Sequence, residues 1–285
     1  MLGTSATVVA DFSLRFIVLA NDTQPEGCDH AEWTLTLTAM GNQFYEPGER
    51  RAERVNDLFN AIAPRYDLIN DLQSFGLHRW WKRRLLQLTA VKPGETALDL
   101  CCGTGDVAFA LAEAGARVSG MDFSASMLAV AEERKAKGKR QKAKVDGPTD
   151  PMFLQGDALH TPFPDAHFDI VTISYGLRNL ASVDKGLREM WRVLKPGGRL
   201  MVLDFGKPDN AAWRSAYFGY LRFAVPVFGR LFCKNAEAYA YILESLQHYP
   251  AQRGVDEKLR ALGAVEARIV NFLGGVMSIN AAAKP

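Results

Sequence analysis

The chain has 285 residues, of which 48% are hydrophobic and 23% charged, a composition typical of one large α/β domain with extensions. A formal net charge of +2 at pH 7 gives no overall attraction to nucleic acid. No run of about 20 uninterrupted apolar residues occurs, so the sequence predicts no membrane-spanning helix. Cys28, Cys101, Cys102 and Cys233 show no CxxC spacing and no histidine at ligand spacing, which argues against a zinc site and favours a reducing, cytoplasmic compartment.

Residues 1–39 differ from the rest of the chain. Their apolar stretch, ATVVADFSLRFIVLA, is broken by Asp11 and Arg15 and lacks the basic start of a signal peptide. Met40 then opens MGNQFYEPGER, which reads like an ordinary bacterial N-terminus. We therefore expect residues 1–39 to be disordered or a misassigned start, and residues 40–285 to form the domain.

The segment after the extension is helical in pattern. RRAERVNDLFNAIAPRYDLIND, residues 50–71, reads as an amphipathic helix interrupted at Pro64. HRWWKRRLLQLTA, residues 78–90, reads as a second such helix. Together they predict an N-terminal helical region over residues 50–90.

Strand and helix patterns alternate from residue 96 onward, which predicts a mostly parallel sheet covered by helices on both faces. The predicted strands are 96–101, 117–122, 151–157, 168–175, 199–205, 266–272 and 276–284. The predicted helices are 106–115, 124–137, 182–194 and 254–263, with Ser124 as an N-cap and KPGG ending the third.

Two further segments stand out by composition. RKAKGKRQKAK, residues 134–144, carries no acid; it is typical of a solvated helix end, with attraction to anionic lipid as the alternative. Residues 212–250 are dense in aromatics interspersed with arginines, a pattern typical of a core or of a dimer contact.

The stretch DLCCGTGD, residues 99–106, joins a predicted strand to a predicted helix. Gly103 and Gly105 permit a tight turn and let backbone N–H groups approach a ligand closely. Enzymes that use NAD and enzymes that use S-adenosylmethionine (SAM) share this geometry, so the glycines alone leave the cofactor open. Cys101 and Cys102 are expected to pack as small apolar residues.

Of the four aspartates near this turn, three favour SAM, whereas Asp122 is a feature that NAD enzymes and SAM enzymes share. Asp99 suits the cationic amino group of a methionine moiety and would repel a pyrophosphate, and Asp106 adds negative charge at the start of the helix. Asp122 ends the second strand, where a carboxylate accepts ribose hydroxyls, and Asp157 ends the third, where it suits an adenine amino group. We interpret the turn as a SAM site, with a dehydrogenase as the alternative.

These residues, in this order, resemble class I SAM-dependent methyltransferases. YDLINDLQSFGLHRWWKR (66–83) and SYGLRNLASVDKGLREMWRVLKPGGRLMVLDFGKP (174–208) resemble signature blocks of the ubiquinone/menaquinone biosynthesis C-methyltransferase family, over residues 50–285. The resemblance implies a Rossmann-like α/β fold, a seven-stranded sheet whose last strand is antiparallel, and an N-terminal helical cap. Cys101 stands where the broader pattern often has glycine. The SAM contacts that the resemblance implies fall on Thr104, Asp122, Asp157, Ala158 and Ser174.

The resemblance also implies a reaction, the transfer of a methyl group from SAM to a ring carbon of a reduced polyprenyl quinol, without a metal. It points to Arg178, in GLRN after the fourth strand, as part of the proton-abstracting machinery. Because a guanidinium is a poor base, we expect Arg178 to stabilise the phenolate, with an ordinary surface ion pair as the alternative. Asn179 is expected to hydrogen-bond the second quinol oxygen.

Tyr66 and His78 lie in the N-terminal signature block, which in such folds caps the cofactor pocket. His78 has a pKa suited to a general base near neutral pH. The alternative is a histidine that simply hydrogen-bonds backbone at a helix start.

A polyprenyl substrate suggests two more interpretations of residues 212–250, a substrate lid and a surface lying against the bilayer. We therefore expect a cytoplasmic protein with peripheral membrane contact at most, and with a homodimer as one use of the aromatic segment. Other acceptors of the same fold class, and a SAM-binding regulator without turnover, remain alternatives at this stage.

Overall fold

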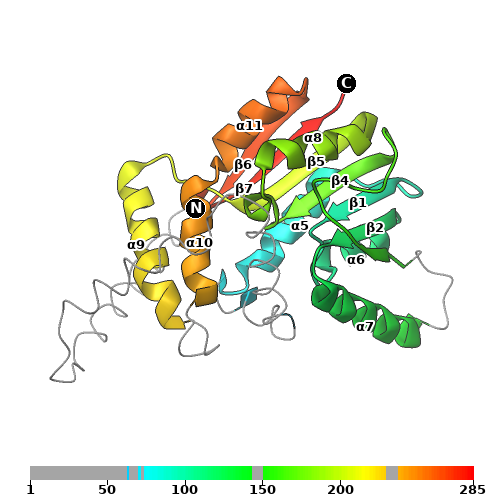
Figure 1. Ribbon diagram of the computed structural model, residues 1–285, viewed down its shortest axis with the longest axis horizontal. Helices are drawn as coiled ribbons and strands as arrows, with labels where there is room; N and C mark the ends of the chain where they lie inside the picture. The colour runs from blue at the N-terminus through cyan, green and yellow to red at the C-terminus, as the bar shows by residue number, and fades with distance from the viewer. Residues whose placement is uncertain (1–62, 64–69, 72–73, 143–149, 229–236) are drawn as a thin grey trace, which may run out of the picture. The chain divides into compact units, whose positions relative to one another are not determined.

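The structure is a computed structural model, and it describes residues 63, 70–71, 74–142, 150–228 and 237–285. Within these residues seven strands form one sheet (Figure 1). The strands are β1 (Thr96–Leu100), β2 (Arg117–Asp122), β3 (Met152–Gln155), β4 (Phe168–Ser174), β5 (Leu194–Phe205), β6 (Val265–Phe272) and β7 (Met277–Ala283).

The strand order is β3-β2-β1-β4-β5-β7-β6. The first five strands of this order are parallel, whereas β7 runs antiparallel to both of its neighbours. The predicted fold, with its last strand antiparallel, is confirmed. The direction of winding reverses between β1 and β4, and ligands of open α/β sheets bind beside such a switch point, at the carboxyl ends of the strands.

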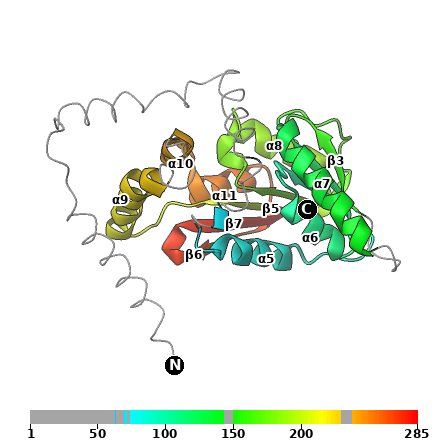
Figure 2. The same cartoon turned by 90° about the horizontal axis from the view of Figure 1, so that it is seen from below.

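Helices cover both faces of this sheet because the strands are apolar on both sides. Figure 2 shows helices on both sides of the sheet. Their buried apolar side chains form two clusters, one with Leu85 and Leu111 and the other with Leu187 and Val255. The described helices are α5 (Leu77–Thr89), α6 (Asp106–Glu113), α7 (Ala125–Lys142), α8 (Val183–Val193), α9 (Ala211–Phe228), α10 (Glu237–His248) and α11 (Ala251–Ala261), with short 3₁₀ turns η2 (Leu177–Asn179) and η4 (Leu273–Gly275).

The fifth strand begins earlier than the sequence predicts. KPGG was expected to end the preceding helix and precede the strand, but β5 already starts at Leu194, which pairs with Phe168. The next parallel pair joins Arg199 to Ile170, so the residues between form a bulge. The backbone of this bulge bonds the chain end, since Gly197 N donates to Lys284 O at 2.8 Å.

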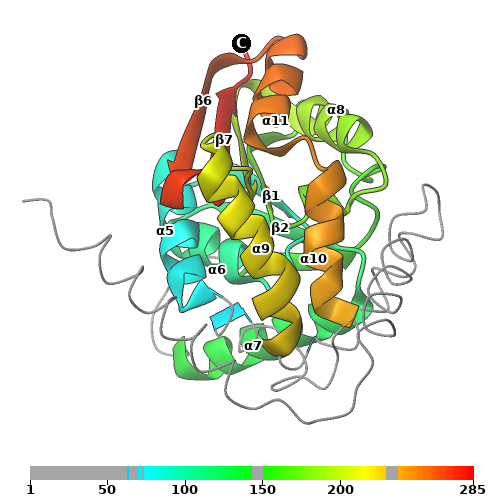
Figure 3. The ribbon, with the colours of Figure 1, turned by 90° about the vertical axis from the view of Figure 1, so that its left-hand side faces the viewer.

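The aromatic segment forms two helices that the sequence did not predict. α9 and α10 lie side by side (Figure 3). Tyr217 and Leu221 of α9, and Ser245 and Leu246 of α10, are buried. Part of the segment therefore belongs to the core, as one of its interpretations required.

None of the helices within the described ranges is long and apolar enough to cross a membrane. The predicted helix over residues 50–71 falls mainly on residues outside the described ones, as do residues 1–39 and Tyr66.

Candidate active site

The glycine turn leads from β1 into α6 at the carboxyl edge of the sheet. Gly105 has a φ of 85°, and a Cβ there would meet the rings of Phe109 and Phe153 at 2.9 Å, so two independent constraints require glycine. Cys101 has a φ of 52°, a left-handed conformation that costs a side chain about 1–2 kcal/mol. This conformation explains why glycine suits the position that Cys101 takes.

Cys101 and Cys102 follow β1 and carry free thiols. Burial raises the pKa of both thiols well above the ordinary value, which makes them poor ligands and poor nucleophiles. Within the described part of the chain, no cluster of histidine, cysteine, aspartate and glutamate could hold a metal ion.

Asp99 lies beneath the turn and is 1% exposed. Thr172 Oγ1 donates a hydrogen bond to Asp99 Oδ1 at 2.7 Å. Burial raises the pKa of Asp99 to about 7, although the Thr172 bond and the charge of Lys82 act in the opposite direction. A cation bound beside Asp99 would stabilise its ionised form.

Asp122, the last residue of β2, ties the turn to the neighbouring strand. Its Oδ2 accepts a hydrogen bond from Gly103 N at 2.8 Å, and its Oδ1 accepts one from Ser124 N at 2.9 Å. Burial raises its pKa, which these backbone bonds partly offset. A carboxylate has about four acceptor positions, so Asp122 retains the capacity to accept ribose hydroxyls.

Asp106, at the first position of α6, carries less unbalanced charge than the sequence predicts. Lys82 Nζ lies 2.7 Å from its Oδ2, and Arg134 Nη2 lies 2.6 Å from its Oδ1. Burial alone would raise the pKa of Asp106, but these two cations hold it at about 2. Asp106 is therefore an anion at the start of α6, as expected, but Lys82 and Arg134 balance its charge. The unbalanced acidic side chains of the turn are those of Asp99 and Asp122.

Asp157 follows β3 and lies next to Asp122 in the sheet, because Gly156 N donates to Asp122 O at 3.0 Å. Its Oδ1 accepts a hydrogen bond from Leu159 N at 2.9 Å, and nearly half of its side chain is exposed. Ala158 is buried in the core beside it. Asp157 is thus accessible to a ligand that lies along this edge.

Ser174 ends β4 on the other side of the switch point. Its hydroxyl is buried and has no hydrogen-bond partner in the structure. A buried hydroxyl without a partner is unusual, and Ser174 also lines the pocket beside the turn.

The turn and the end of β4 enclose a small pocket of about 30 Å³, room for about two water molecules. A nucleoside enters it only when side chains along its rim move. The residues that line it are Lys82, Asp99, Cys101, Cys102, Gly103, Thr104, Asp106, Val107, Ser174 and Tyr175.

Arg178 lies in η2, just beyond β4, and is only 6% exposed. Its Nε lies 3.2 Å from Asp204 Oδ1, and its Nη1 donates to Ser245 Oγ at 3.1 Å. The guanidinium carbon lies 5.0 Å from the centre of the Phe205 ring. The ion pair is buried, so the alternative of an ordinary surface ion pair is wrong.

Asp204, the last but one residue of β5, holds Arg178 from two directions. It is 1% exposed, and its Oδ2 also accepts a hydrogen bond from the Arg178 backbone N at 3.1 Å. Burial raises its pKa while the charge of Arg178 lowers it. The guanidinium is consequently fixed in orientation, and its charge is partly balanced.

Asn179 is engaged within the same loop. Its Oδ1 accepts a hydrogen bond from Arg178 Nη1 at 2.7 Å, and its Nδ2 donates to Tyr175 O at 3.1 Å. In this conformation Asn179 orients Arg178.

His78 lies in the first turn of α5 and is 5% exposed. Its Nδ1 lies 2.9 Å from Ser74 Oγ and 3.7 Å from Asp71 Oδ1. Burial lowers its pKa, and the charge of Lys82 lowers it further. Among the described residues, α5 contributes Lys82 rather than His78 to the lining of the pocket.

The comparisons with known proteins agree with this geometry. A profile described as the ubiE/COQ5 methyltransferase family matches residues 48–284. The chain belongs to this family. It is 38% identical over 242 residues to the demethylmenaquinone methyltransferase of Desulfitobacterium hafniense (strain Y51), covering 84% of this chain and 92% of that one.

A second relative gives the same result. The ubiquinone/menaquinone biosynthesis C-methyltransferase UbiE of Cellvibrio japonicus (strain Ueda107) is 39% identical over 243 residues, which cover 84% of this chain and 94% of that one. Among solved structures, the phosphoethanolamine N-methyltransferase 2 of Haemonchus contortus in complex with SAM shares the fold. It has a TM-score of 0.52 at 20% identity, with 72% of this chain and 52% of that one covered.

The chain is therefore a SAM-dependent methyltransferase, and the chemistry of the residues around the pocket suits this methyl donor. The unpartnered Ser174 hydroxyl, the acidic side chains of Asp99 and Asp122, and the glycine turn are the features that fit a cationic nucleoside. A dinucleotide would place a pyrophosphate beside Asp99, which argues against the dehydrogenase alternative.

Sequence reasoning missed three charged residues of this site. Lys82 and Arg134 belong to basic runs in which no residue stands out, and only folding brings them to Asp106. Asp204 did carry a signal, since it is an acid near the end of an apolar strand, where a charge needs a buried partner.

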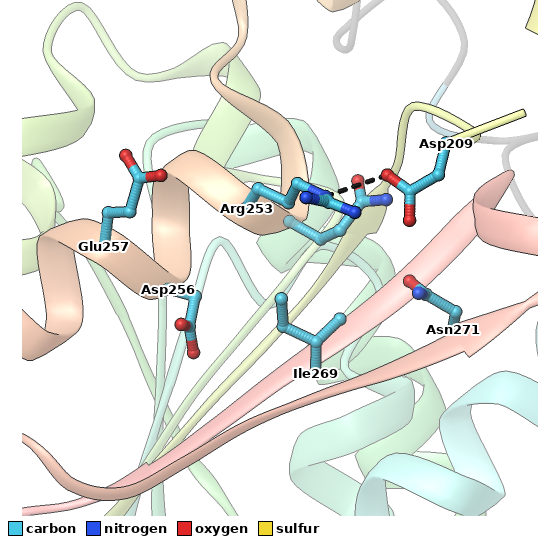
Figure 4. A pocket seen from close by; sticks show the side chains of 7 residues that line it. Asp209, Arg253, Asp256, Glu257, Ile269 and Asn271 are labelled. Carbon is cyan, nitrogen blue, oxygen red and sulfur yellow. Dashed lines mark hydrogen bonds and ion pairs between the residues drawn. The ribbon is translucent and has the colours of Figure 1, made fainter. Parts of the chain in front are cut away.

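A larger cavity, of about 350 Å³, lies elsewhere, between α11 and β6 (Figure 4). Arg253 points toward Asp209 there, with Nε 2.8 Å from Oδ1. Asp256 and Glu257 add further acids to its wall. None of the predicted site residues lines this cavity, so its size does not make it the active site.

Proposed function

We propose that this chain transfers the methyl group of SAM to a ring carbon of a reduced polyprenyl quinol, either demethylmenaquinol or the corresponding ubiquinone precursor. The observation that carries the proposal is the buried guanidinium of Arg178, which Asp204 fixes beside the end of β4. It lies at the same edge of the sheet as the glycine turn. The names of the two relatives, one a demethylmenaquinone methyltransferase, support this acceptor.

The residues at the ends of β1 to β4 divide the recognition of SAM. In the proposal Asp99 binds the methionine ammonium. Asp122 accepts hydrogen bonds from the ribose hydroxyls, and Asp157 accepts one from the adenine amino group. The Ser174 hydroxyl, which has no partner within the chain, donates a hydrogen bond to SAM. The backbone approaches SAM closely at four residues, Gly103, Thr104, Gly105 and Ala158.

The chemistry requires a nucleophilic ring carbon. SAM supplies an electrophilic methyl group whose C–S bond electrons stay with sulfur. The quinol becomes nucleophilic when its hydroxyl loses a proton, because the phenolate donates electron density to the adjacent carbon. That carbon forms the new C–C bond, while the phenolate oxygen becomes a carbonyl. The carbon then loses its own proton, which restores the aromatic ring and the phenolate, and the oxygen regains a proton to give the methylated quinol.

Arg178 stabilises the phenolate in this scheme. A positive charge held in a water-poor site by Asp204 acts without reorganisation when negative charge develops on the oxygen. Asn179 and Ser245 fix the remaining orientation of the guanidinium. In the proposal Asn179 also reaches the second quinol oxygen.

The proposal also gives Tyr66, which lies outside the described residues, and His78 a role in the reaction of the quinol. Burial lowers the pKa of His78, which keeps its imidazole neutral at pH 7 and able to accept a proton. His78 is thus our candidate for the proton acceptor, while Arg178 remains the electrostatic partner.

Residues 212–250 cover the prenyl tail and rest on the bilayer in this proposal. Tyr220 and Phe223 of α9 are exposed one turn apart, and Arg222 lies over the Phe223 ring at 5.7 Å. Exposed aromatics beside arginines suit the interface between lipid and water. Residues 1–39 stay outside this machinery in the proposal.

The test is an acceptor assay with SAM labelled in its methyl group. The purified chain is given a short-chain demethylmenaquinol and, separately, the matching benzoquinol precursor, both under reducing conditions. Label in the lipid product at a ring carbon supports the proposal, and the ratio of the two rates identifies the ring. No transfer to either quinol, with SAM bound, would contradict it.

A further inference from the structure

Lys82 is the one cation among the described residues that line the SAM pocket. Its Nζ lies 2.7 Å from Asp106 Oδ2 and 6.0 Å from the centre of the Tyr175 ring. The side chain is 16% exposed, so its charge acts in a poorly solvated place. Lys82 belongs to α5, whereas the proposed cofactor contacts described above come from residues at the ends of the strands.

Asp106 does not depend on Lys82 alone. Arg134 Nη2 lies 2.6 Å from the other oxygen of the same carboxylate. Arg134 also donates to Thr104 O at 3.0 Å, which fixes it to the turn. If the ammonium of Lys82 turns away from Asp106, this carboxylate therefore keeps a cationic partner.

The methionine moiety of SAM carries an ammonium and a carboxylate. Asp99 suits the ammonium, but the carboxylate would be a further anion in a pocket that Asp99 and Asp106 already line. A buried anion without a cationic partner is strongly unfavourable. The ligand therefore needs a cation on this side of the pocket.

We propose that Lys82 binds the carboxylate of the methionine moiety of SAM, exchanging Asp106 for this ligand. The inference rests on the use of SAM within the proposed function and is independent of the acceptor.

The test compares ligands with and without the carboxylate by isothermal titration calorimetry on the full chain. S-adenosylhomocysteine carries both charged groups of the methionine moiety, decarboxylated S-adenosylhomocysteine lacks the carboxylate, and methylthioadenosine lacks both groups. Lys82→Met should lower the affinity for S-adenosylhomocysteine about 10- to 100-fold. It should change the two other affinities by less than about threefold.

Two further variants complete the design. Lys82→Arg should restore most of the affinity for S-adenosylhomocysteine, and Arg83→Met, at the next and exposed position of the same helix, should change nothing. Lys82→Gln repeats the test if the methionine variant does not fold. An equal loss for all three ligands, or no loss for S-adenosylhomocysteine, would overturn the proposal. The quinol assay plays no part in either result.

Discussion

Asp99 carries a carboxylate whose pKa lies at about 7 because the side chain is buried. At that pKa the group is about one tenth ionised at pH 6 and about nine tenths at pH 8. Only the ionised form pairs with an ammonium. If Asp99 binds the methionine ammonium, as proposed, cofactor binding is sensitive to pH near neutrality.

We predict that the affinity for S-adenosylhomocysteine rises up to about tenfold between pH 6 and pH 8. Lys82 and Asp122 face Asp99, and their charges act in opposite directions on its pKa. Calorimetry at several pH values checks the slope. Asp99→Asn should bind more weakly and lose the slope, and a wild-type affinity that does not change with pH would contradict the assignment.

Asp106 gives a second prediction, about stability. Its pKa is lowered to about 2 in the folded chain, against about 3.9 when unfolded. The ionised Asp106 carboxylate therefore stabilises the folded chain above pH 4, and this stabilisation is lost as the pH falls toward 2. The wild-type advantage over Asp106→Asn in free energy of unfolding should shrink by about 1 kcal/mol from pH 6 to pH 3.

Urea denaturation at the two pH values measures this difference. Comparing the two proteins at each pH removes the contributions of Asp169 and Glu189, whose pKa values are also held at about 2. An advantage of equal size at both pH values would show that Lys82 and Arg134 do not stabilise the Asp106 anion.

The positions of the acidic residues could be predicted from the sequence, whereas their partners could not. Asp99 and Asp122 stand out because they sit in or end apolar strands, and strand ends meet at one edge of the sheet. Lys82 and Arg134 reach Asp106 from other helices, at sequence separations that no local pattern encodes.

At the scale of elements, strands were predictable and the aromatic helices were not. β1 and β4 read as apolar runs because both faces of the sheet are covered. In α9 and α10 aromatic residues follow one another closely, so no amphipathic period marks a helix. The KPGG sequence is typical of a turn, but in the structure it forms a bulge within β5. Its backbone is hydrogen-bonded to the C-terminal end of the chain, through Gly197 N and Lys284 O.

The exposed side of α9 gives the prediction at this scale. Replacing Tyr220 and Phe223 by serine removes two aromatic side chains that are 38% and 66% exposed. The double variant should bind vesicles of phosphatidylglycerol and phosphatidylcholine at least about fivefold more weakly. Met152→Ser, an exposed apolar residue of β3, is the matched control and should bind like wild type in a flotation assay.

An unchanged flotation of the double variant would exclude α9 as the lipid-contacting element. If the same variant instead shifted a dimer to a monomer, the aromatic side would be a subunit contact. Analytical ultracentrifugation of both proteins separates these results.

At the scale of the whole chain, the family profile begins at residue 48. The fold and the enzyme class could be predicted from the sequence because residues 66–83 and 174–208 carry the signature blocks of the family. Both blocks lie within the residues that the family profile matches. Nothing in residues 1–39 corresponds to either block.

We therefore predict that a chain starting at Met40 keeps its melting temperature within about 2 °C and its affinity for S-adenosylhomocysteine within about twofold. Calorimetry on the truncated and full-length chains checks both values. A clear loss of either would mean that the first 39 residues support the domain.

The central claim is that Arg178 stabilises the phenolate of a quinol during methyl transfer to its ring. Single-turnover transfer from labelled SAM to demethylmenaquinol or to the benzoquinol precursor, whichever is the better acceptor, compared between wild type and Arg178→Met, tests it most directly. We predict a rate at least about 100-fold lower in the variant, with the affinity for S-adenosylhomocysteine within about threefold of wild type. Full activity of the variant would contradict the claim.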